Sequence, residues 1–214
     1  MPRTTVNYVT SSKFKQEENE VFRRIITLPD GSPVDDIFDF RIRELSIPET
    51  LEVRIETMVT AEVKQAYATL KVPCIVEHAG LIFEDYRSHS YPGGLTKPMW
   101  NTLAANFIEE THSSGRKAAA RAVVAYCDGM KVHTFEGETL GTISDQPRGA
   151  RDFYWDTVFI PTDDNPEKLT YAEIVEAGAS GIEKKIQLSQ STKAMLAFLT
   201  WRLTNEPDLW QITY

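Results

Sequence analysis

The sequence predicts an α/β protein. Short apolar or alternating stretches, typical of β-strands, take turns with longer stretches whose apolar residues recur every three or four positions, as on one face of a helix. A chain of 214 residues is long enough to bury a sizeable core as one domain or as two lobes, and 42% hydrophobic with 25% charged residues is an ordinary globular composition. We therefore expect residues 1–214 to form a single domain.

The first half of the chain predicts three strands and two helices. Residues 6–9 are apolar and extended in character, and the hydroxyls of residues 10–12 can cap a helix over residues 13–25. Residues 38–45 alternate as a strand does. Apolar residues then recur at helical spacing over residues 50–70, and residues 72–83 form a strand-like run with charge in its middle.

The second half predicts a helix, a hairpin, a strand and a closing helix. A helix over residues 98–110 is followed by AAARAVVAY, which reads as helical by propensity. However, Asp128-Gly129 is a strong hairpin signal and residues 131–135 alternate, so we predict a hairpin over residues 118–135. Pro161 ends a short β-branched strand, and residues 189–203 form an amphipathic helix.

Charge and cysteine content exclude several classes of function. A net charge of -8 argues against a general nucleic-acid or anionic-membrane surface, both of which need a basic face. A polyanionic ligand would need local lysines and a divalent metal. Cys74 and Cys127 are too few for a disulfide framework and lack zinc-ligand spacing. The start of the chain has no apolar signal segment, and no run of about 18 apolar residues occurs. These features predict a soluble, cytoplasmic protein.

The stretch from Gly141 to Pro161 is the first candidate for a ligand site. A loop rich in Pro and Gly precedes Phe153, Trp155 and Asp156. A flat aromatic ring beside a carboxylate offers a planar heterocycle a stacking face and an acceptor for its ring N–H groups. The competing interpretation is a turn followed by a buried strand.

The second candidate is the start of the first helix. A strand, a turn of hydroxyl residues, a helix N-terminus and Lys15 together suit a phosphate, because the first N–H groups and the helix dipole favour an anion. The competing interpretation is an ordinary capped helix with solvated lysines.

Several motifs in register resemble one family. PRGARDFYWDTVFIP is similar to the PRG…GFGWDPIFIP pattern of the inosine triphosphate pyrophosphatases, and TSSKFK, PE, VEHAGL, YPGG and TYAEI follow the family's order from Val6 to about Leu203. The resemblance implies an elongated central mixed β-sheet flanked by helices, with two lobes and the site in the cleft between them. It also implies hydrolysis of nucleoside triphosphates to monophosphates and pyrophosphate, and a homodimer.

The resemblance also implies a set of phosphate and metal residues. It assigns phosphate binding to Thr10, Ser12, Lys15 and Lys64, with Ser12 in place of the family's usual Asn. A divalent cation, Mg²⁺ in the first instance, is expected on Glu49 and Glu77. Alternatives to Glu49 are the nearby acids at positions 52 and 56.

The base site implied by the resemblance departs from the family. Its expected residues are Phe153, Trp155, Asp156, Lys185, Ser189 and Gln190. Gln190 and Ser191 stand where the family has His and Arg, which read the 6-oxo group of the purine, and Tyr154 stands where the family has Gly. These departures predict an altered base preference.

The largest departure is His78, which replaces the second acid of the family's metal-binding pair. Three interpretations stay open. His78 ligates a metal or acts as general base beside Glu77, in which case Mn²⁺ or Co²⁺ deserves testing. Alternatively, Glu77, Glu84 or Asp85 carries the metal. In the third case activity is lost, and the protein is a nucleotide-binding or regulatory module of the same fold.

Overall fold

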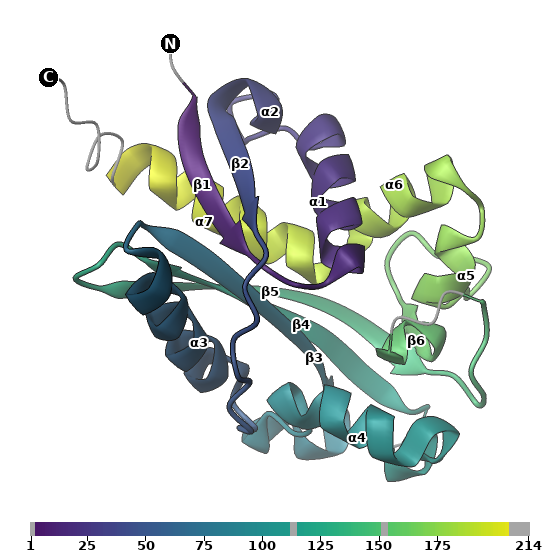
Figure 1. The fold of residues 1–214 in the computed structure, drawn as a ribbon. Helices are drawn as coiled ribbons and strands as arrows, with labels where there is room; N and C mark the ends of the chain where they lie inside the picture. Colours follow the sequence, from purple (N-terminus) through teal and green to yellow (C-terminus); the bar gives the residue numbers. More distant parts are fainter. Residues whose placement is uncertain (1–2, 112–114, 151–153, 206–214) are drawn as a thin grey trace, which may run out of the picture.

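The computed structural model describes residues 3–111, 115–150 and 154–205, and its centre is a mixed six-stranded sheet (Figure 1). The strands are β1 (Thr4–Val9), β2 (Phe38–Arg43), β3 (Cys74–Phe83), β4 (Lys117–Cys127), β5 (Val132–Ile143) and β6 (Phe159–Pro161). They lie in the order β2-β1-β3-β4-β5-β6. β1 pairs in parallel with β2 and β3, and all later pairs are antiparallel. The predicted α/β class with a mixed sheet is confirmed.

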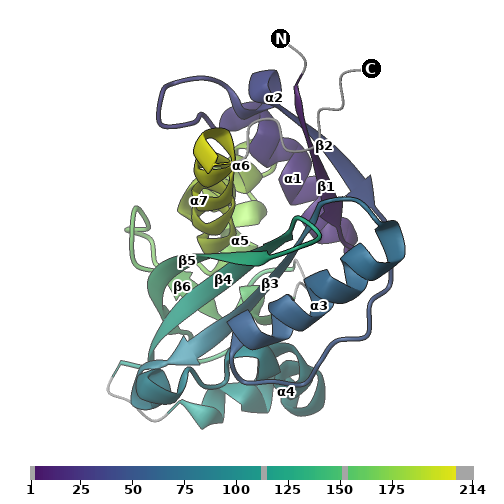
Figure 2. The ribbon, with the colours of Figure 1, turned by 90° about the vertical axis from the view of Figure 1, so that its left-hand side faces the viewer.

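Helices cover both faces of this sheet. The α-helices are α1 (Lys13–Ile25), α2 (Val34–Ile37), α3 (Ile55–Leu70), α4 (Thr96–Leu103), α5 (Tyr171–Val175), α6 (Ala179–Leu188) and α7 (Gln190–Asn205). Short 3₁₀ segments are η1 (Glu84–His89), η2 (Gly93–Leu95), η3 (Ala104–Glu110) and η4 (Tyr154–Thr157). Figure 2 shows α3 and α7 on opposite sides of β3, β4 and β5. Within the described residues, no helix combines the length and the apolarity that crossing a bilayer requires.

The apolar core divides into two lobes. One lobe joins α1 and α7 to one face of the sheet through residues such as Phe22, Phe38 and Phe198, while α3 packs on the other face. The second lobe lies at the far end of the long strands, where Phe83, Phe159 and other residues bury against α5 and η3. Polar groups collect between the lobes, so the architecture places a cleft there.

Local sequence explains most element boundaries. The predicted hairpin is confirmed, because the Asp128 carboxylate accepts hydrogen bonds from two backbone N–H groups of the turn and Gly129 takes a positive φ of 102°. The predicted helix over residues 98–110 is broken at Ala104, whose φ is 47°. Helix α6 was not expected from EAGASGIEKK, since two glycines lower its helical propensity.

Two glycines allow the backbones around the cleft to approach closely. A Cβ on Gly137 of β5 would lie 2.1 Å from the Gln190 carbonyl oxygen, so only glycine lets the start of α7 sit on the strand. A Cβ on Gly80 of β3 would meet the Gly93 carbonyl at the same distance, and this approach positions η2 and α4. Both contacts determine where cleft residues stand.

Candidate active site

A cleft of about 710 Å³ lies between the two lobes. Its volume is in the range of small-molecule sites. Its walls come from the β1–α1 turn, the irregular segment before α3, one face of α3, the middle of β3, α4, η4 and the junction of α6 with α7. Segments far apart in the sequence therefore contribute side chains to one space.

The β1–α1 turn forms the cap that the sequence predicts. The Thr10 hydroxyl accepts a hydrogen bond from the Ser12 N–H at 3.1 Å, and the Ser12 hydroxyl accepts from the Lys15 N–H at 3.4 Å. Both hydroxyl residues line the cleft. The N-terminus of α1, with the positive end of its dipole, therefore opens onto the cleft.

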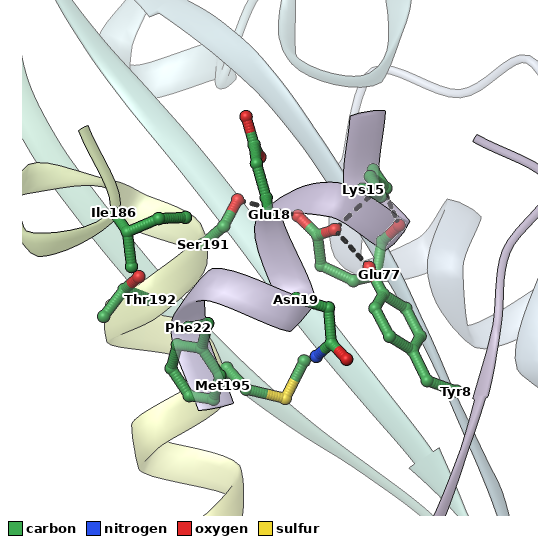
Figure 3. A pocket seen from close by; sticks show the side chains of 10 residues that line it. All are labelled: Tyr8, Lys15, Glu18, Asn19, Phe22, Glu77, Ile186, Ser191, Thr192 and Met195. Atoms are coloured by element: carbon green, nitrogen blue, oxygen red, sulfur yellow. Dashed lines mark hydrogen bonds and ion pairs between the residues drawn. The ribbon is translucent and has the colours of Figure 1, made fainter. Parts of the chain in front are cut away.

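Lys15 is held by Glu77 at the floor of the cleft (Figure 3). The Lys15 Nζ lies 2.9 Å from Glu77 Oε2, which also accepts from the Tyr8 hydroxyl at 3.0 Å, while Glu77 Oε1 accepts from the Ser191 hydroxyl at 2.9 Å. Burial alone would raise the pKa of Glu77, but the charge of Lys15 and these hydrogen bonds lower it overall. Both carboxylate oxygens are thus already occupied by donors.

Beside this group lies a small cavity of about 40 Å³, and Figure 3 draws the side chains that line it. Side chains from α1 and α7 line it together with Tyr8 and Glu77. It is too small for a nucleotide, so we assign ligand binding to the large cleft and regard the small cavity as an extension of its floor.

Lys97 and Glu49 form a second ion pair in the cleft. The Lys97 Nζ lies 2.6 Å from Glu49 Oε1, and both side chains are about one-third exposed. Burial would lower the pKa of Lys97, but Glu49 raises it overall. The same Nζ lies 5.5 Å from the centre of the Tyr154 ring, which is close enough for a cation–π contact.

Tyr154 keeps a backbone geometry that suits glycine. Its φ is 49°, in the left-handed region, where a non-glycine residue costs on the order of 1–3 kcal/mol. The resembled family has Gly at this position. The chain therefore retains the backbone turn while placing an aromatic ring in the cleft beside Lys97.

Glu62 is a buried acid on the inner face of α3. It is 4% exposed, and its Oε1 atom has no hydrogen-bond partner among the described residues. Burial raises the pKa of Glu62 to about 7, and the charge of Glu49 adds to this effect against the opposing charges of Lys15 and Lys97. Sequence reasoning did not single out this residue.

His78 lies in the middle of the cleft and is neutral at neutral pH. Burial lowers its pKa to about 4, helped by Lys15, while Glu49 and Glu77 oppose the shift. No hydrogen bond or ion pair joins its imidazole to another side chain in the described part of the chain. A neutral imidazole offers a lone pair to a proton or a metal.

A buried charge triad occupies the other end of the cleft. The Lys185 Nζ lies 2.5 Å from Asp156 Oδ2 and 2.7 Å from Glu18 Oε1, and all three side chains are largely or fully buried. Burial would lower the pKa of Lys185, but Asp156 and Glu18 raise it overall. The predicted neighbours Asp156 and Lys185 are brought together, and the triad adds Glu18.

The remaining predicted base residues have structural partners. Trp155 is 6% exposed and packs edge-to-face on Phe159, so only a small part of it faces the cleft. The Ser189 hydroxyl accepts from the Thr192 N–H and caps α7. Gln190 Oε1 accepts from the Tyr171 hydroxyl at 3.1 Å. The sixth predicted residue, Phe153, lies outside the described residues.

Three acids and bases weighed from the sequence lie elsewhere. Lys64 is exposed on α3 and is absent from the cleft lining, because it lies two residues, or about 200° of helical turn, from Glu62. The structure therefore does not bring Lys64 into the cleft lining with the other predicted phosphate residues. Glu84 and Asp85 are exposed in η1 and also lie outside the lining, so the structure does not bring them together with the acids of the cleft.

The carboxylates of the cleft are the type of ligand that a divalent cation prefers, but fewer than three of them are grouped at one point among the described residues. Mg²⁺ prefers carboxylate oxygens and commonly uses one or two of them together with phosphate and water. Among the described residues, no three His, Cys, Asp or Glu side chains are grouped to hold a metal. The orphaned oxygen of Glu62 beside Glu49 is the observation that favours a cation here.

Comparison with known proteins shows the family to which this chain belongs. The sequence profile described as the Ham1 family matches residues 6–201. The chain belongs to the Ham1 family. A dITP/XTP pyrophosphatase of Methanopyrus kandleri is 32% identical over 165 residues, covering 76% of this chain and 82% of the relative. The inosine triphosphate pyrophosphatase 2 of Trypanosoma cruzi is 30% identical over 167 residues, covering 72% and 75%.

Solved Ham1 structures share the fold. A HAM1 protein from Coxiella burnetii superposes with a TM-score of 0.65 at 19% identity, covering 93% of this chain and 98% of that one. The Ham1 protein of Staphylococcus aureus gives 0.59 at 18% identity, covering 92% and 98%. The family resemblance predicted from the sequence motifs is confirmed.

In this Ham1 protein, sequence reasoning missed residues for which signals existed. Lys97 lies within YPGGLTKPMW, the loop that resembles the family. Glu18 keeps the family's opening pattern with Lys15 and shares its helix face, but sequence reasoning gave it no role in the site. Glu62 interrupts the apolar stripe formed by Met58, Val59 and Ala66, which marks a buried acid. Ser191 was noted only as a departure from the family's Arg, and Tyr8 carried no local signal.

Proposed function

We propose that this chain hydrolyses nucleoside triphosphates to nucleoside monophosphates and pyrophosphate, with a purine base as the preferred class. The observation that carries the proposal is the pairing, in one cleft, of a cationic and hydroxyl-rich wall with a buried carboxylate–lysine triad. The first suits a polyphosphate and the second suits the polar edge of a base. The names of the relatives point to the same class of substrate.

The phosphate wall supports binding of the triphosphate. The hydroxyls of Thr10 and Ser12 and the first N–H groups of α1 donate toward an anion. Lys15 supplies charge from the floor, and we assign Lys97 the second clamping role that the sequence gave to Lys64. Fixed donors of this kind stabilise the charge that develops as the bond between the α- and β-phosphates breaks.

His78 is our candidate for the group that receives a proton from the attacking water. Its imidazole is neutral and lies within the electrostatic reach of two lysines, Lys15 and Lys97, and two glutamates, Glu49 and Glu77. The phosphates would offset the lysine charges that lower its pKa, so the bound substrate would make it a stronger base. Cleft carboxylates including Glu49 would hold a divalent cation, Mg²⁺ or Mn²⁺, which would neutralise phosphate charge as a Lewis acid.

The base end supports a preference that differs from that of the relatives. Asp156 would accept from a ring N–H, and Lys185 holds that carboxylate in place. Gln190 uses its Oε1 on Tyr171, which leaves its amide N–H₂ as the donor toward a 6-oxo group. A neutral amide would therefore donate the hydrogen bond that charged side chains donate in the resembled family. The Tyr154 ring also lines the cleft and narrows it.

The deciding experiment is an incubation of the purified protein with standard and deaminated nucleoside triphosphates and Mg²⁺ or Mn²⁺. Released pyrophosphate and orthophosphate are measured separately. We expect pyrophosphate with a preferred base. Orthophosphate as the main product would contradict cleavage between the α- and β-phosphates.

One observation favours a second candidate, a nucleotide-binding module without turnover. His78 replaces an expected acid, and both oxygens of Glu77 are engaged by Lys15, Tyr8 and Ser191. Calorimetric binding of a nonhydrolysable triphosphate, combined with no turnover of the parent nucleotide, would select this candidate.

A homodimer is proposed by family analogy only, and sedimentation analysis tests it.

A further inference from the structure

Glu62 is the least satisfied acid of the cleft. It lies on the apolar stripe of α3 between Val59 and Val63, where helical periodicity otherwise places core residues. It is more than nine-tenths buried and lines the cleft, and its Oε1 atom has no hydrogen-bond partner in the described residues. None of the ion pairs found among those residues involves it.

Such a carboxylate needs a partner that the protein itself does not provide. A buried polar atom without a hydrogen bond costs on the order of 1–3 kcal/mol, and a buried unpaired charge costs more. The cost is met when a cation binds the free oxygen. Glu49 is a near electrostatic neighbour, so a second carboxylate is available beside Glu62.

We propose that Glu62 and Glu49 form a two-carboxylate subsite for a divalent cation. Only the role of this cation in phosphate binding rests on the proposed function. The subsite replaces the expected pair of Glu49 and Glu77. The Glu77 oxygens are engaged by Lys15, Tyr8 and Ser191, so this carboxylate anchors Lys15. Glu62 has a buried oxygen without a hydrogen-bond partner among the described residues, which Glu77 lacks.

The subsite also gives Lys97 two states. Lys97 pairs with Glu49 at 2.6 Å in this structure. A cation on Glu49 competes with Lys97 for the same carboxylate and frees its Nζ to meet a phosphate. Cation binding and nucleotide binding therefore assist each other.

The test is a calorimetric titration of the metal-free full chain with Mn²⁺ alone, in the absence of nucleotide. We expect Glu62→Gln to weaken Mn²⁺ binding at least about tenfold, as loss of a ligand does. Glu49→Gln, at an exposed position that leaves folding intact, is expected to weaken it similarly. The matched control is Glu56→Gln on the same helix but outside the cleft lining, with unchanged affinity.

Thermal unfolding provides a second readout. Without metal, Glu62→Gln is expected to be at least as stable as the parent protein, because it removes a buried unpaired carboxylate. Addition of Mn²⁺ should raise the Tm of the parent and of Glu56→Gln but not of Glu62→Gln. An unchanged Mn²⁺ affinity and an unchanged Tm rise in Glu62→Gln would overturn the subsite.

Pyrophosphate release separates this proposal from the proposed function. Mn²⁺ binding that depends on Glu62, in a protein without turnover, supports the subsite and contradicts the enzyme. Turnover in the parent protein, with Mn²⁺ affinity lost in Glu77→Gln and kept in Glu62→Gln, supports the enzyme and overturns the subsite.

Discussion

The two ends of the cleft satisfy their charges in opposite ways. The Lys185 end consists of Glu18, Asp156 and Lys185. The Glu62 end consists of Glu49, Glu62, His78 and Lys97. At the Lys185 end, one cation lies between two carboxylates with short contacts, and burial is nearly complete. At the Glu62 end, one ion pair is part-exposed, and one carboxylate oxygen and one imidazole have no side-chain partner among the described residues.

On the proposed function, this difference separates an end that is prepared in advance to read the base from an end that the triphosphate and its cation would complete. A base is small, planar and neutral, so a rigid and internally neutralised edge can read it without large changes in charge. A triphosphate brings several negative charges and a cation, so the end that meets it must exchange partners. The folded protein therefore bears an electrostatic cost at the Glu62 end that binding relieves.

The largest expected effect is loss of the buried cation at the Lys185 end. Lys185→Met leaves Glu18 and Asp156 buried without their cation, and we expect a loss of about 3–5 kcal/mol in the free energy of unfolding. Urea denaturation at neutral pH measures it. The neighbouring and less buried Lys184→Met is the control, with a change within about 0.5 kcal/mol.

The pH dependence of this stability has a definite sign. The pKa of Lys185 is raised above 10.5 in the folded state. Its contribution is therefore fully present below the unfolded pKa and is lost as the pH rises through the folded value. The difference in stability between parent and Lys185→Met should hold up to about pH 10 and shrink above it. If the difference in stability disappeared between pH 7 and 9, the interpretation that the buried charge of Lys185 stabilises this end of the cleft would be refuted.

The second effect concerns activity at the Glu62 end. Lys97→Ala is expected to lower kcat/KM for a nucleoside triphosphate roughly 10²-fold, because a charge that stabilises the transition state is removed. Its effect on stability should be small, since the side chain is about one-third exposed. Steady-state assay of pyrophosphate release measures the first and urea denaturation the second.

Lys64→Ala makes the companion comparison. The sequence expectation was a strong loss with Lys64, whereas the exposed position outside the cleft lining predicts an unchanged kcat/KM. A loss in Lys64→Ala together with normal kinetics in Lys97→Ala would reverse our assignment of the phosphate lysines.

The third effect concerns base choice at the Lys185 end. Gln190→Leu removes the amide donor, so the ratio of kcat/KM for inosine triphosphate over ATP should fall about tenfold, as expected for one hydrogen bond. The exposed Gln187→Leu on α6 is the matched control and should leave the ratio unchanged. A rise of this kcat/KM ratio in Gln190→Leu would show that the Gln190 side chain disfavours a base with a 6-oxo group.

The contrast between the ends also explains what the sequence could predict. Strands and most helices followed from periodicity, and Asp156 and Lys185 could be named because their motifs lie in short, ordered segments. Lys64 lies on the predicted helix but outside the cleft lining, because two residues along a helix point in opposite directions: Lys64 faces solvent and Glu62 faces the cleft. Local spacing alone does not determine that choice.

Other parts of the site depend on packing between distant segments. Glu49 belongs to an irregular stretch before α3, and its pairing with Lys97 joins that stretch to α4 across 48 residues. The bond from Ser191 to Glu77 spans 114 residues. Helix α6 was missed because its glycines weaken the helical signal, although tertiary contacts with α1 and α5 support it. Such contacts are tertiary and leave no periodic trace in the sequence.

The smallest expected effect on the free energy of unfolding comes from a charge cluster outside the cleft. This cluster is a solvent-screened reference against which the charges at both ends of the cleft can be compared. Glu138 on β5 accepts from Arg121 at 2.7 Å and from Arg87 at 2.6 Å, with the three side chains 20–39% exposed. Burial would raise the pKa of Glu138, but the hydrogen bonds from both arginines lower it overall. Because solvent screens this cluster, we expect Glu138→Gln to cost no more than about 1 kcal/mol at neutral pH.

The sign of its pH dependence is opposite to that of Lys185. A lowered folded-state pKa gives stability that is present above the unfolded pKa and is lost as the pH falls through the folded value. The difference between parent and Glu138→Gln in urea denaturation should therefore narrow from pH 5 toward pH 3, and high salt should narrow it further. If Glu138→Gln cost as much as Lys185→Met, the depth of burial would not be what distinguishes the Lys185 end, and its rigidity would need another cause.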